Sequence, residues 1–182
     1  SNTDGNYDLI IIDPVRSYTS GHNNLYSLEA LALYSKQLSP EGVFCAWHDE
    51  THSIPKTIAS SFPYLDQFGD LSVASNQPLA YDLEFMEQSA TIFLAQSGER
   101  SPGLDEALQA ERLLGNFTRD RDQLLREEAD SPLLTDMWPR LEYYFNTKPI
   151  EDQLSKDYAV RNLFAERISG CDDRCRDYIR TR

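Results

Sequence analysis

The stretch YDLIIID, residues 7–13, decides the fold class of this chain. Its consecutive apolar residues, Leu9 and three β-branched isoleucines, are typical of a strand buried on both faces. The strand ends at a carboxylate, Asp13, and a proline follows. Because ligands of open α/β sheets bind outside the carboxyl ends of the strands, Asp13 marks the place where we expect a site.

The residues after this strand complete a strand–helix–strand unit. Residues 25–38 carry the apolar stripe of a helix, which Ser27 is placed to cap. Residues 39–42, SPEG, are typical of a turn, and residues 43–47, VFCAW, form a second short apolar strand. Strands joined through a helix lie parallel, so the fold class is α/β.

The rest of the chain adds an antiparallel edge and a helical extension. Residues 64–68 and 70–75 are expected to pair as antiparallel strands around Gly69, which makes the sheet mixed. A polar break at 98–103 divides a domain of residues 1–98 from a helical extension of residues 99–182. We expect helices at 54–62, 82–97, 104–128, 150–168 and 172–182, with an interruption at Gly170 and irregular chain over 131–148. Residues 91–94 alone also fit a strand, and we favour the helix over 82–97.

Composition excludes several classes of partner. The 182 residues include 30 acidic and 17 basic side chains, a net charge of −13, which disfavours nucleic acid or an anionic membrane surface as a partner. No apolar run reaches the roughly 20 residues of a membrane span. Three cysteines, an odd number, argue against a disulfide framework and suit the reducing cytoplasm. Helical spacing rarely closes a disulfide, so we expect free thiols at Cys171 and Cys175.

Three polar or aromatic clusters are further candidates for a site. Residues 48–52, HDETH, have the composition of a metal site, of a cleft lining or of an ordinary polar loop. We do not predict a metal, because the pattern lacks the spacing that places two histidines on one helix face. The aromatic cluster at 138 and 143–145 fits packing on the sheet better than a partner surface. The run RDRD, residues 119–122, fits a solvated helix face better than a docking site.

Two separated segments of the chain carry a further pattern. The first segment runs from YDLIIIDP through Asn24-Leu25-Tyr26 to LSPEGVF at 38–44. The second is TDMWPRLEY at 135–143. Together they resemble the spermidine synthase (polyamine aminopropyltransferase) family, and above all its fused, membrane-attached relatives, in which a segment similar to the second lies near the end of the synthase domain. The resemblance covers residues 7–80 and 131–145. It implies the C-terminal part of a methyltransferase-like, Rossmann-type doubly wound sheet with an added helical tail.

The same resemblance implies transfer of an aminopropyl group from decarboxylated S-adenosylmethionine to an amine. Asp13 would be the catalytic residue, because the amine must lose a proton and its charge must be held and oriented. Alternatively, Asp13 only orients the loop that follows it. The implied cofactor-side residues are Asp13 and Pro14, and the implied substrate-side residues are Arg16, Tyr18, Tyr26 and His48.

One residue departs from the family pattern. The family carries a second polyamine-binding carboxylate three residues after the first, and this chain has Arg16 there. An arginine repels a polyamine and suits an anionic substrate or none. Asp13 therefore favours an enzyme, and Arg16 favours a non-catalytic module that regulates or scaffolds an attached transmembrane transporter. An S-adenosylmethionine-dependent methyltransferase is a third interpretation.

The cofactor-binding part of this fold is expected upstream of Tyr7. In the family, the glycine-rich turn and the ribose carboxylate lie in that upstream part. The 182 residues of this chain contain no G-x-G. We therefore expect the fragment neither to bind the nucleotide cofactor tightly nor to turn over. The same reasoning leaves the strand at 7–13 as an unpaired apolar edge, which either another chain or the C-terminal helices must cover. We expect a homodimer through that edge.

Overall fold

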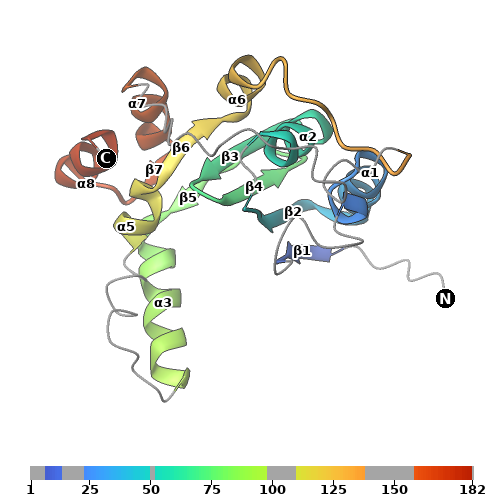
Figure 1. Cartoon of the computed structure of the whole chain (residues 1–182). Coiled ribbons are helices and arrows are strands. Elements are labelled where there is room, and N and C mark those ends of the chain that lie inside the picture. The colour runs from blue at the N-terminus through green and yellow to red at the C-terminus, as the bar shows by residue number, and fades with distance from the viewer. Residues whose placement is uncertain (1–6, 14–22, 50–51, 98–109, 138–157, 182) are drawn as a thin grey trace. The chain divides into compact units, whose positions relative to one another are not determined.

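The computed structural model describes residues 7–13, 23–49, 52–97, 110–137 and 158–181 (Figure 1). They belong to two compact units, Ser1–Leu79 with Asp120–Leu154, and Ala80–Arg119 with Ser155–Arg182. Helices and a mixed sheet give an α/β structure, as predicted. The predicted domain boundary at 98–103 and the aromatic cluster at 138–145 lie outside the described residues.

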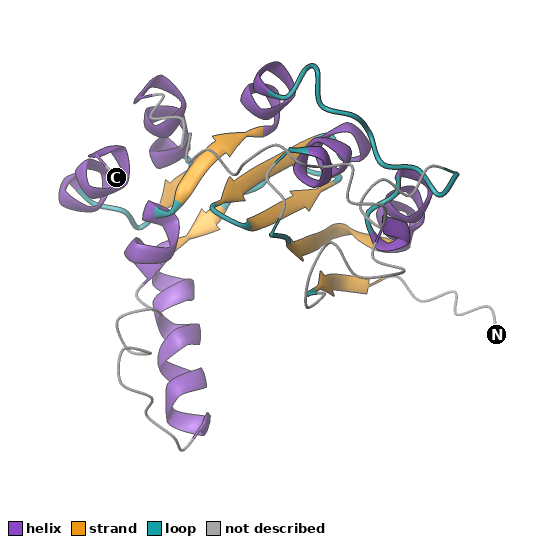
Figure 2. Ribbon diagram, in the orientation of Figure 1, coloured by secondary structure: helices purple, strands orange, loops and turns teal. Residues whose placement is uncertain are grey.

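The first unit is organised on a mixed sheet (Figure 2). β1 (Tyr7–Ile12) pairs parallel with β2 (Leu38–Trp47). β4 (Leu71–Ser75) pairs antiparallel with β2 and with β3 (Tyr64–Phe68), so the strand order here is β1-β2-β4-β3. Gly69 joins β3 to β4 at a positive φ of 57°, a conformation that glycine adopts without strain. The predicted parallel pair and antiparallel hairpin are both confirmed.

The helix between the parallel strands begins at the predicted cap. After the short η1 (Asn23–Leu25), α1 spans Leu28–Gln37, and the Ser27 hydroxyl accepts a hydrogen bond from the backbone N–H of Ala30 at 3.2 Å. This bond satisfies one of the N–H groups that a helix start leaves without a partner. α2 (Ser53–Ser61) and α6 (Arg121–Glu127) are the other helices described in this unit.

The prediction of a turn at residues 39–42 is wrong, because these residues belong to β2. The β1–β2 register passes from Tyr7 opposite Leu38 to Leu9 opposite Val43, so residues 39–42 form a bulge. The Ser39 hydroxyl donates to Asp8 Oδ1 at 2.7 Å across it. A Cβ on Gly42 would lie 2.7 Å from the Tyr7 carbonyl oxygen, so this close approach of two backbones requires glycine.

All three α-helices of this unit contribute to one hydrophobic core against one face of the sheet. Ile10, Phe44, Ala74 and Leu65 follow one another across the four strands and belong to this core. The Phe44 ring stacks on Tyr34 of α1 at 5.6 Å and on Phe62 at 5.2 Å between ring centroids. The helices complete the core with Leu31, Ile54, Ile58 and Leu124.

β1 is not buried on both faces, so that prediction is wrong. Leu9 is 53% exposed and Ile11 is 65% exposed, whereas Ile10 and Ile12 pack against the core. The reason is the position of β1 at the edge of the sheet, with Leu9 and Ile11 on the face opposite the core. The second prediction for this strand, an open apolar edge, is confirmed for the described residues.

The second unit combines short elements from both halves of its chain. α3 (Leu83–Ser97) confirms the helix predicted at 82–97. β5 (Tyr81–Asp82) pairs parallel with β7 (Ile168–Ser169). The remaining helices are α5 (Ala110–Gly115), α7 (Tyr158–Glu166) and α8 (Asp173–Thr181), and Gly170, with a φ of 77°, separates the last two as predicted.

The helix predicted across 104–128 is interrupted by a strand, β6 (Phe117–Asp120). Phe117 and Thr118 favour extended backbone, and the Phe117 ring stacks on Phe164 at 4.0 Å between centroids. Arg119 is only 9% exposed, and the Asp120 carboxylate accepts from the Gln123 N–H as the cap of α6. The interpretation of RDRD as a solvated helix face is therefore wrong for its first two residues.

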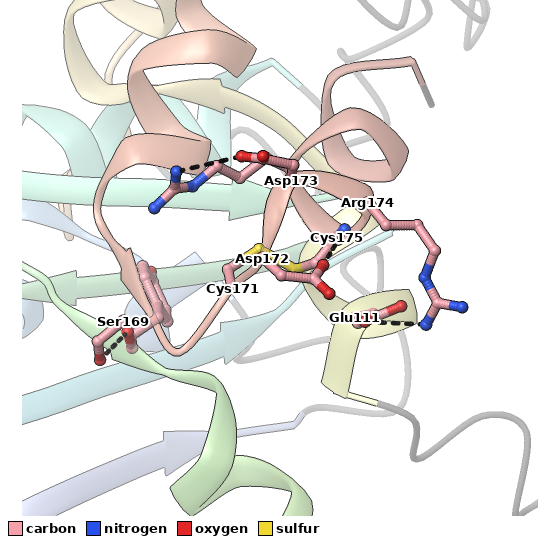
Figure 3. The surroundings of a disulfide bond; sticks show 9 residues. Glu111, Ser169, Cys171, Asp172, Asp173, Arg174 and Cys175 are labelled. Carbon is pink, nitrogen blue, oxygen red and sulfur yellow. Dashed lines mark hydrogen bonds and ion pairs between the residues drawn. A yellow bond between two sulfur atoms is a disulfide. The ribbon is translucent and has the colours of Figure 1, made fainter.

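Cys171 and Cys175 form a disulfide, so the prediction of free thiols is wrong (Figure 3). Cys171 precedes α8 and follows the positive-φ Gly170, and the two Cα atoms lie 5.4 Å apart. The Asp172 carboxylate accepts from the Cys175 N–H at 2.8 Å in the first turn of the helix. Cys171 therefore lies outside the helix, so the helical spacing that disfavours a disulfide does not apply to this pair. The cysteines no longer support a reducing compartment.

Candidate functional site at the carboxyl ends of β1 and β2

The carboxyl ends of β1 and β2 bring two acidic residues to one edge of the sheet. The parallel register ends with Ile12 opposite Ala46. Asp13 follows β1 and is exposed, and Asp49 lies two residues beyond the end of β2 and is half-buried. This is the position where open α/β sheets bind ligands.

Tyr26 lies beside the ends of both strands. Its side chain is fully buried, and its hydroxyl donates to the carbonyl oxygen of Trp47, the last residue of β2, at 2.5 Å. Burial raises the pKa of Tyr26 well above its ordinary value, and the negative charges of Asp49 and then Asp13 raise this pKa further. The phenol is therefore a neutral donor, and both carboxylates are near enough to act on it.

A distant segment packs beside the chain that carries Tyr26. The Asn23 amide donates to the Thr135 carbonyl at 3.0 Å, and the Leu28 N–H donates to the Leu134 carbonyl at 2.9 Å. The Leu134 N–H in turn donates to the Thr57 hydroxyl on α2 at 3.1 Å. The start of the TDMWPRLEY segment is thus held beside the chain around Asn24-Leu25-Tyr26 by one backbone hydrogen bond and by the side-chain amide of Asn23.

This packing adds two more acidic residues around the N-terminus of α1. The Asp136 N–H donates to Glu29 Oε2 at 3.1 Å. Burial raises the pKa of Tyr34, and the charge of Asp136 raises it further. The surroundings of both tyrosines are therefore negative, an environment that favours a cationic ligand over an anionic one.

The two histidines of residues 48–52 serve different contacts. His48 is 1% exposed, and its Nε2 lies 2.9 Å from the hydroxyl of Ser72 on β4. His52 Nδ1 lies 2.9 Å from Glu128 Oε2, at the end of α6, and this carboxylate also accepts from the Ser131 hydroxyl at 2.7 Å. Residues 50–51 lie outside the described part of the chain. Within that part, no group of three or more His, Cys, Asp or Glu side chains is placed to hold a metal ion.

The structure brings part of the predicted site together. Asp13 and Tyr26 share the carboxyl edge of the sheet, and His48 is buried just beyond the end of β2. Pro14, Arg16 and Tyr18 lie outside the described residues. Asp49 was not predicted as a site residue of its own. Its place directly after the second parallel strand was the signal that would have identified it.

The comparisons with known proteins add no family to this picture. No protein-family model matches the chain, and no curated protein matches it significantly. Helices long and apolar enough to cross a membrane are not found among the described residues. Function must therefore be inferred from the two carboxylates, the buried tyrosine and the segment packed beside it.

Proposed function

We propose that this chain is part of a spermidine synthase-like protein and that its β1–β2 edge binds a cationic amine. The observation that supports this most directly is the placement of Asp13 and Asp49 at adjacent strand ends, where both act on the buried Tyr26. The parallel β1–α1–β2 unit is compatible with the methyltransferase-like, doubly wound sheet that the proposal includes. In this proposal Asp49 first holds the ammonium group by its positive charge, and Asp13 then accepts one proton from it, which leaves a neutral amine and a neutral Asp13 carboxyl group.

With Asp49 at the neighbouring strand end, the positive charge of Arg16 argues less strongly against an amine ligand. The family's second carboxylate follows the first along the same loop, whereas Asp49 comes from the neighbouring strand. The negative charges of Asp13 and Asp49 outnumber the one positive charge of residue 16, and Glu29 and Asp136 add negative charge near α1. Asp49 thus replaces, from another part of the chain, the charge that position 16 lacks.

The described residues do not fit the nucleotide part of an S-adenosylmethionine-type cofactor. Such a cofactor needs a glycine-rich turn after a strand. Gly42 packs on the backbone of β1, Gly69 lies in the β3–β4 turn, and Gly115 faces the Tyr178 ring. We therefore derive no transfer step here, and limit the role of this chain to binding, orienting and deprotonating the amine.

Calorimetry with 1,4-diaminobutane tests the amine site. We expect saturable binding by the wild type, about tenfold or more weaker binding by D13N and by D49N, and no binding of the dianion succinate, because a charged hydrogen bond contributes roughly 1.5–3 kcal/mol. E41Q, which changes an exposed carboxylate near the amino end of β2, is the control and should bind like the wild type. Binding that is unaffected by D13N and D49N would refute the proposal.

The second candidate is a non-catalytic module attached to a membrane transporter, and one observation favours it. Arg16 stands where the family has its second substrate carboxylate. Succinate binding without diamine binding would support this module over an amine enzyme. Both candidates would place the chain in the cytoplasm, a compartment in which the Cys171–Cys175 disulfide would be unusual.

A further inference from the structure

The Cys171–Cys175 disulfide closes the turn between β7 and α8 of the second unit (Figure 3). Cys171 is 5% exposed and Cys175 is 1% exposed, but residues 172–174 between them are all exposed. The bridge therefore lies directly beneath a turn that faces solvent. Local opening of this turn, without unfolding of the unit, is enough to bring the two sulfur atoms to solvent.

The bridge is short, and other contacts hold the same turn. It joins residues only four positions apart, and because stabilisation by a disulfide grows with the loop that it closes, this one acts mainly on the turn itself. The Asp172 carboxylate accepts from the Cys175 N–H at 2.8 Å, and the Ser169 hydroxyl donates to the Tyr81 carbonyl at 3.1 Å. Neither hydrogen bond needs the bridge. The two cysteines therefore stay close together when the bridge opens, so that it can close again.

The start of α8 distinguishes the two sulfur atoms chemically. Cys175 lies in the first turn of the helix, where the helix dipole favours a negative charge, whereas Cys171 precedes the helix and is the more exposed of the two. The two arginines that flank Cys175 in the chain offset the two aspartates before them. A small thiolate therefore attacks the Cys171 sulfur, and Cys175 leaves as the thiolate, because exchange is faster when the leaving thiolate is stabilised.

We propose that Cys171 and Cys175 form a reversible thiol switch, which a small cytosolic thiol opens and the corresponding disulfide closes. The first thiolate breaks the S–S bond, forms a mixed disulfide with Cys171 and releases Cys175. A second thiolate attacks the mixed disulfide, releases Cys171 and leaves as the oxidised small disulfide. Two small thiols thus supply two electrons and two protons to the bridge, and the reverse steps close it. Disulfides of cytosolic proteins are usually transient and catalytic or redox-sensing. Only the choice of compartment rests on the proposed function.

Opening of the switch acts on α8 and on the residue that α8 holds. The buried Arg161 guanidinium donates to the Ile179 carbonyl near the end of α8 at 2.7 Å, and also to the Phe117 carbonyl at the start of β6. Without the bridge, the first turn of α8 loses its covalent link to β7, so the helix opens more often. The redox state of the pair therefore controls how firmly Arg161 joins α8 to the start of β6.

A glutathione titration of the whole chain tests whether the bridge is reversible. The protein is equilibrated at increasing ratios of reduced to oxidised glutathione, free thiols are alkylated, and each cysteine is followed by peptide mass spectrometry. We expect Cys171 and Cys175 to become alkylated together in millimolar reduced glutathione and to be protected again when oxidised glutathione is restored. C45S removes the free thiol on β2 and is the control, which should give the same titration. A bridge that stays closed in millimolar reduced glutathione would overturn the proposal.

Amide hydrogen exchange tests the consequence for α8. Exchange in the first turns of α8 should become about tenfold or more faster when the wild type is reduced, whereas exchange in β2 should not change. C171S should exchange in α8 like the reduced wild type, with and without reductant. Equal exchange in α8 of the oxidised and the reduced wild type would show that the pair controls nothing, and would contradict the switch. Neither measurement uses a diamine, so failure of the amine site leaves both tests unaffected.

Discussion

Replacement of Tyr26 by phenylalanine tests the arrangement at the centre of the site. The substitution keeps the buried ring and removes the hydroxyl that donates to the Trp47 carbonyl at 2.5 Å. A buried acceptor left without its donor costs about 1–3 kcal/mol. For a chain of this length, a loss of about 2 kcal/mol lowers Tm by about 4–8 °C.

The pH dependence of the same variant is the sharper part of the prediction. Because burial and the charges of Asp49 and Asp13 raise the pKa of Tyr26 above 10.0, the folded protein keeps this proton at pH values where the unfolded chain loses it. The resulting stabilisation is complete below pH 10 and is lost as the pH rises above it. The slope is at most about 1.4 kcal/mol per pH unit for one group. Y26F lacks this group, so its stability should fall less steeply than that of the wild type.

Urea unfolding between about pH 8 and pH 11 measures both effects, with stability taken from the linear dependence on denaturant. Burial raises the pKa of the Cys45 thiol to about 11 and also raises the pKa of Tyr34, but both groups titrate in the wild type and in Y26F. Their contribution cancels in the difference. Y64F, which removes a hydroxyl from a 40% exposed side chain, is the control and should follow the wild type. Parallel loss of stability by Y26F and the wild type above pH 10 would refute the reasoning.

Three further substitutions test the fold. G42A forces a methyl group to 2.7 Å from the Tyr7 carbonyl oxygen, so urea unfolding should show a loss of about 1–3 kcal/mol. C171S removes the disulfide to Cys175 and should cost about 2 kcal/mol; a reductant should destabilise the wild type equally and leave C171S unchanged. R161L removes the buried guanidinium that donates to two backbone carbonyls of the second unit, and should cost about 2–4 kcal/mol in the same assay. R161K should not restore this stability, because one ammonium lacks the fork that reaches both carbonyls.

The β1–α1–β2 unit was predictable because its signals are local. Short apolar runs, a serine cap and helical periodicity each act within a few residues. The bulge at residues 39–42 was not predictable, because serine, proline and glycine there also fit a turn. These residues belong to the strand because they contact two groups of β1, the Asp8 carboxylate and the Tyr7 carbonyl.

Burial of a strand is likewise a property of its neighbours. The run of apolar residues in β1 gives its extended backbone, but only the strand order shows that one side and one face are open. The disulfide was likewise not predictable from the local sequence alone. The spacing of Cys171 and Cys175 suggests two positions on one helix, and the positive φ of Gly170 moves the first cysteine out of it.

Part of the candidate site was likewise predictable from local sequence, and part was not. Asp13 follows from a general rule about strand ends, and the rule applied to β2 leads to Asp49, which the neighbouring histidines obscured as part of a metal pattern. The packing of Leu134 and Thr135 beside Tyr26 has no local signal, because its hydrogen bonds join residues about a hundred positions apart in the sequence.

The choice between enzyme and silent module therefore depends on the cofactor side of the site more than on the amine side. Position 16 alone suggests that a polyamine is repelled, but Asp49 comes from another strand and keeps the edge negative together with Asp13. Diamine binding that depends on both carboxylates would indicate a retained acceptor site. The question left would be which residues supply the transferred group.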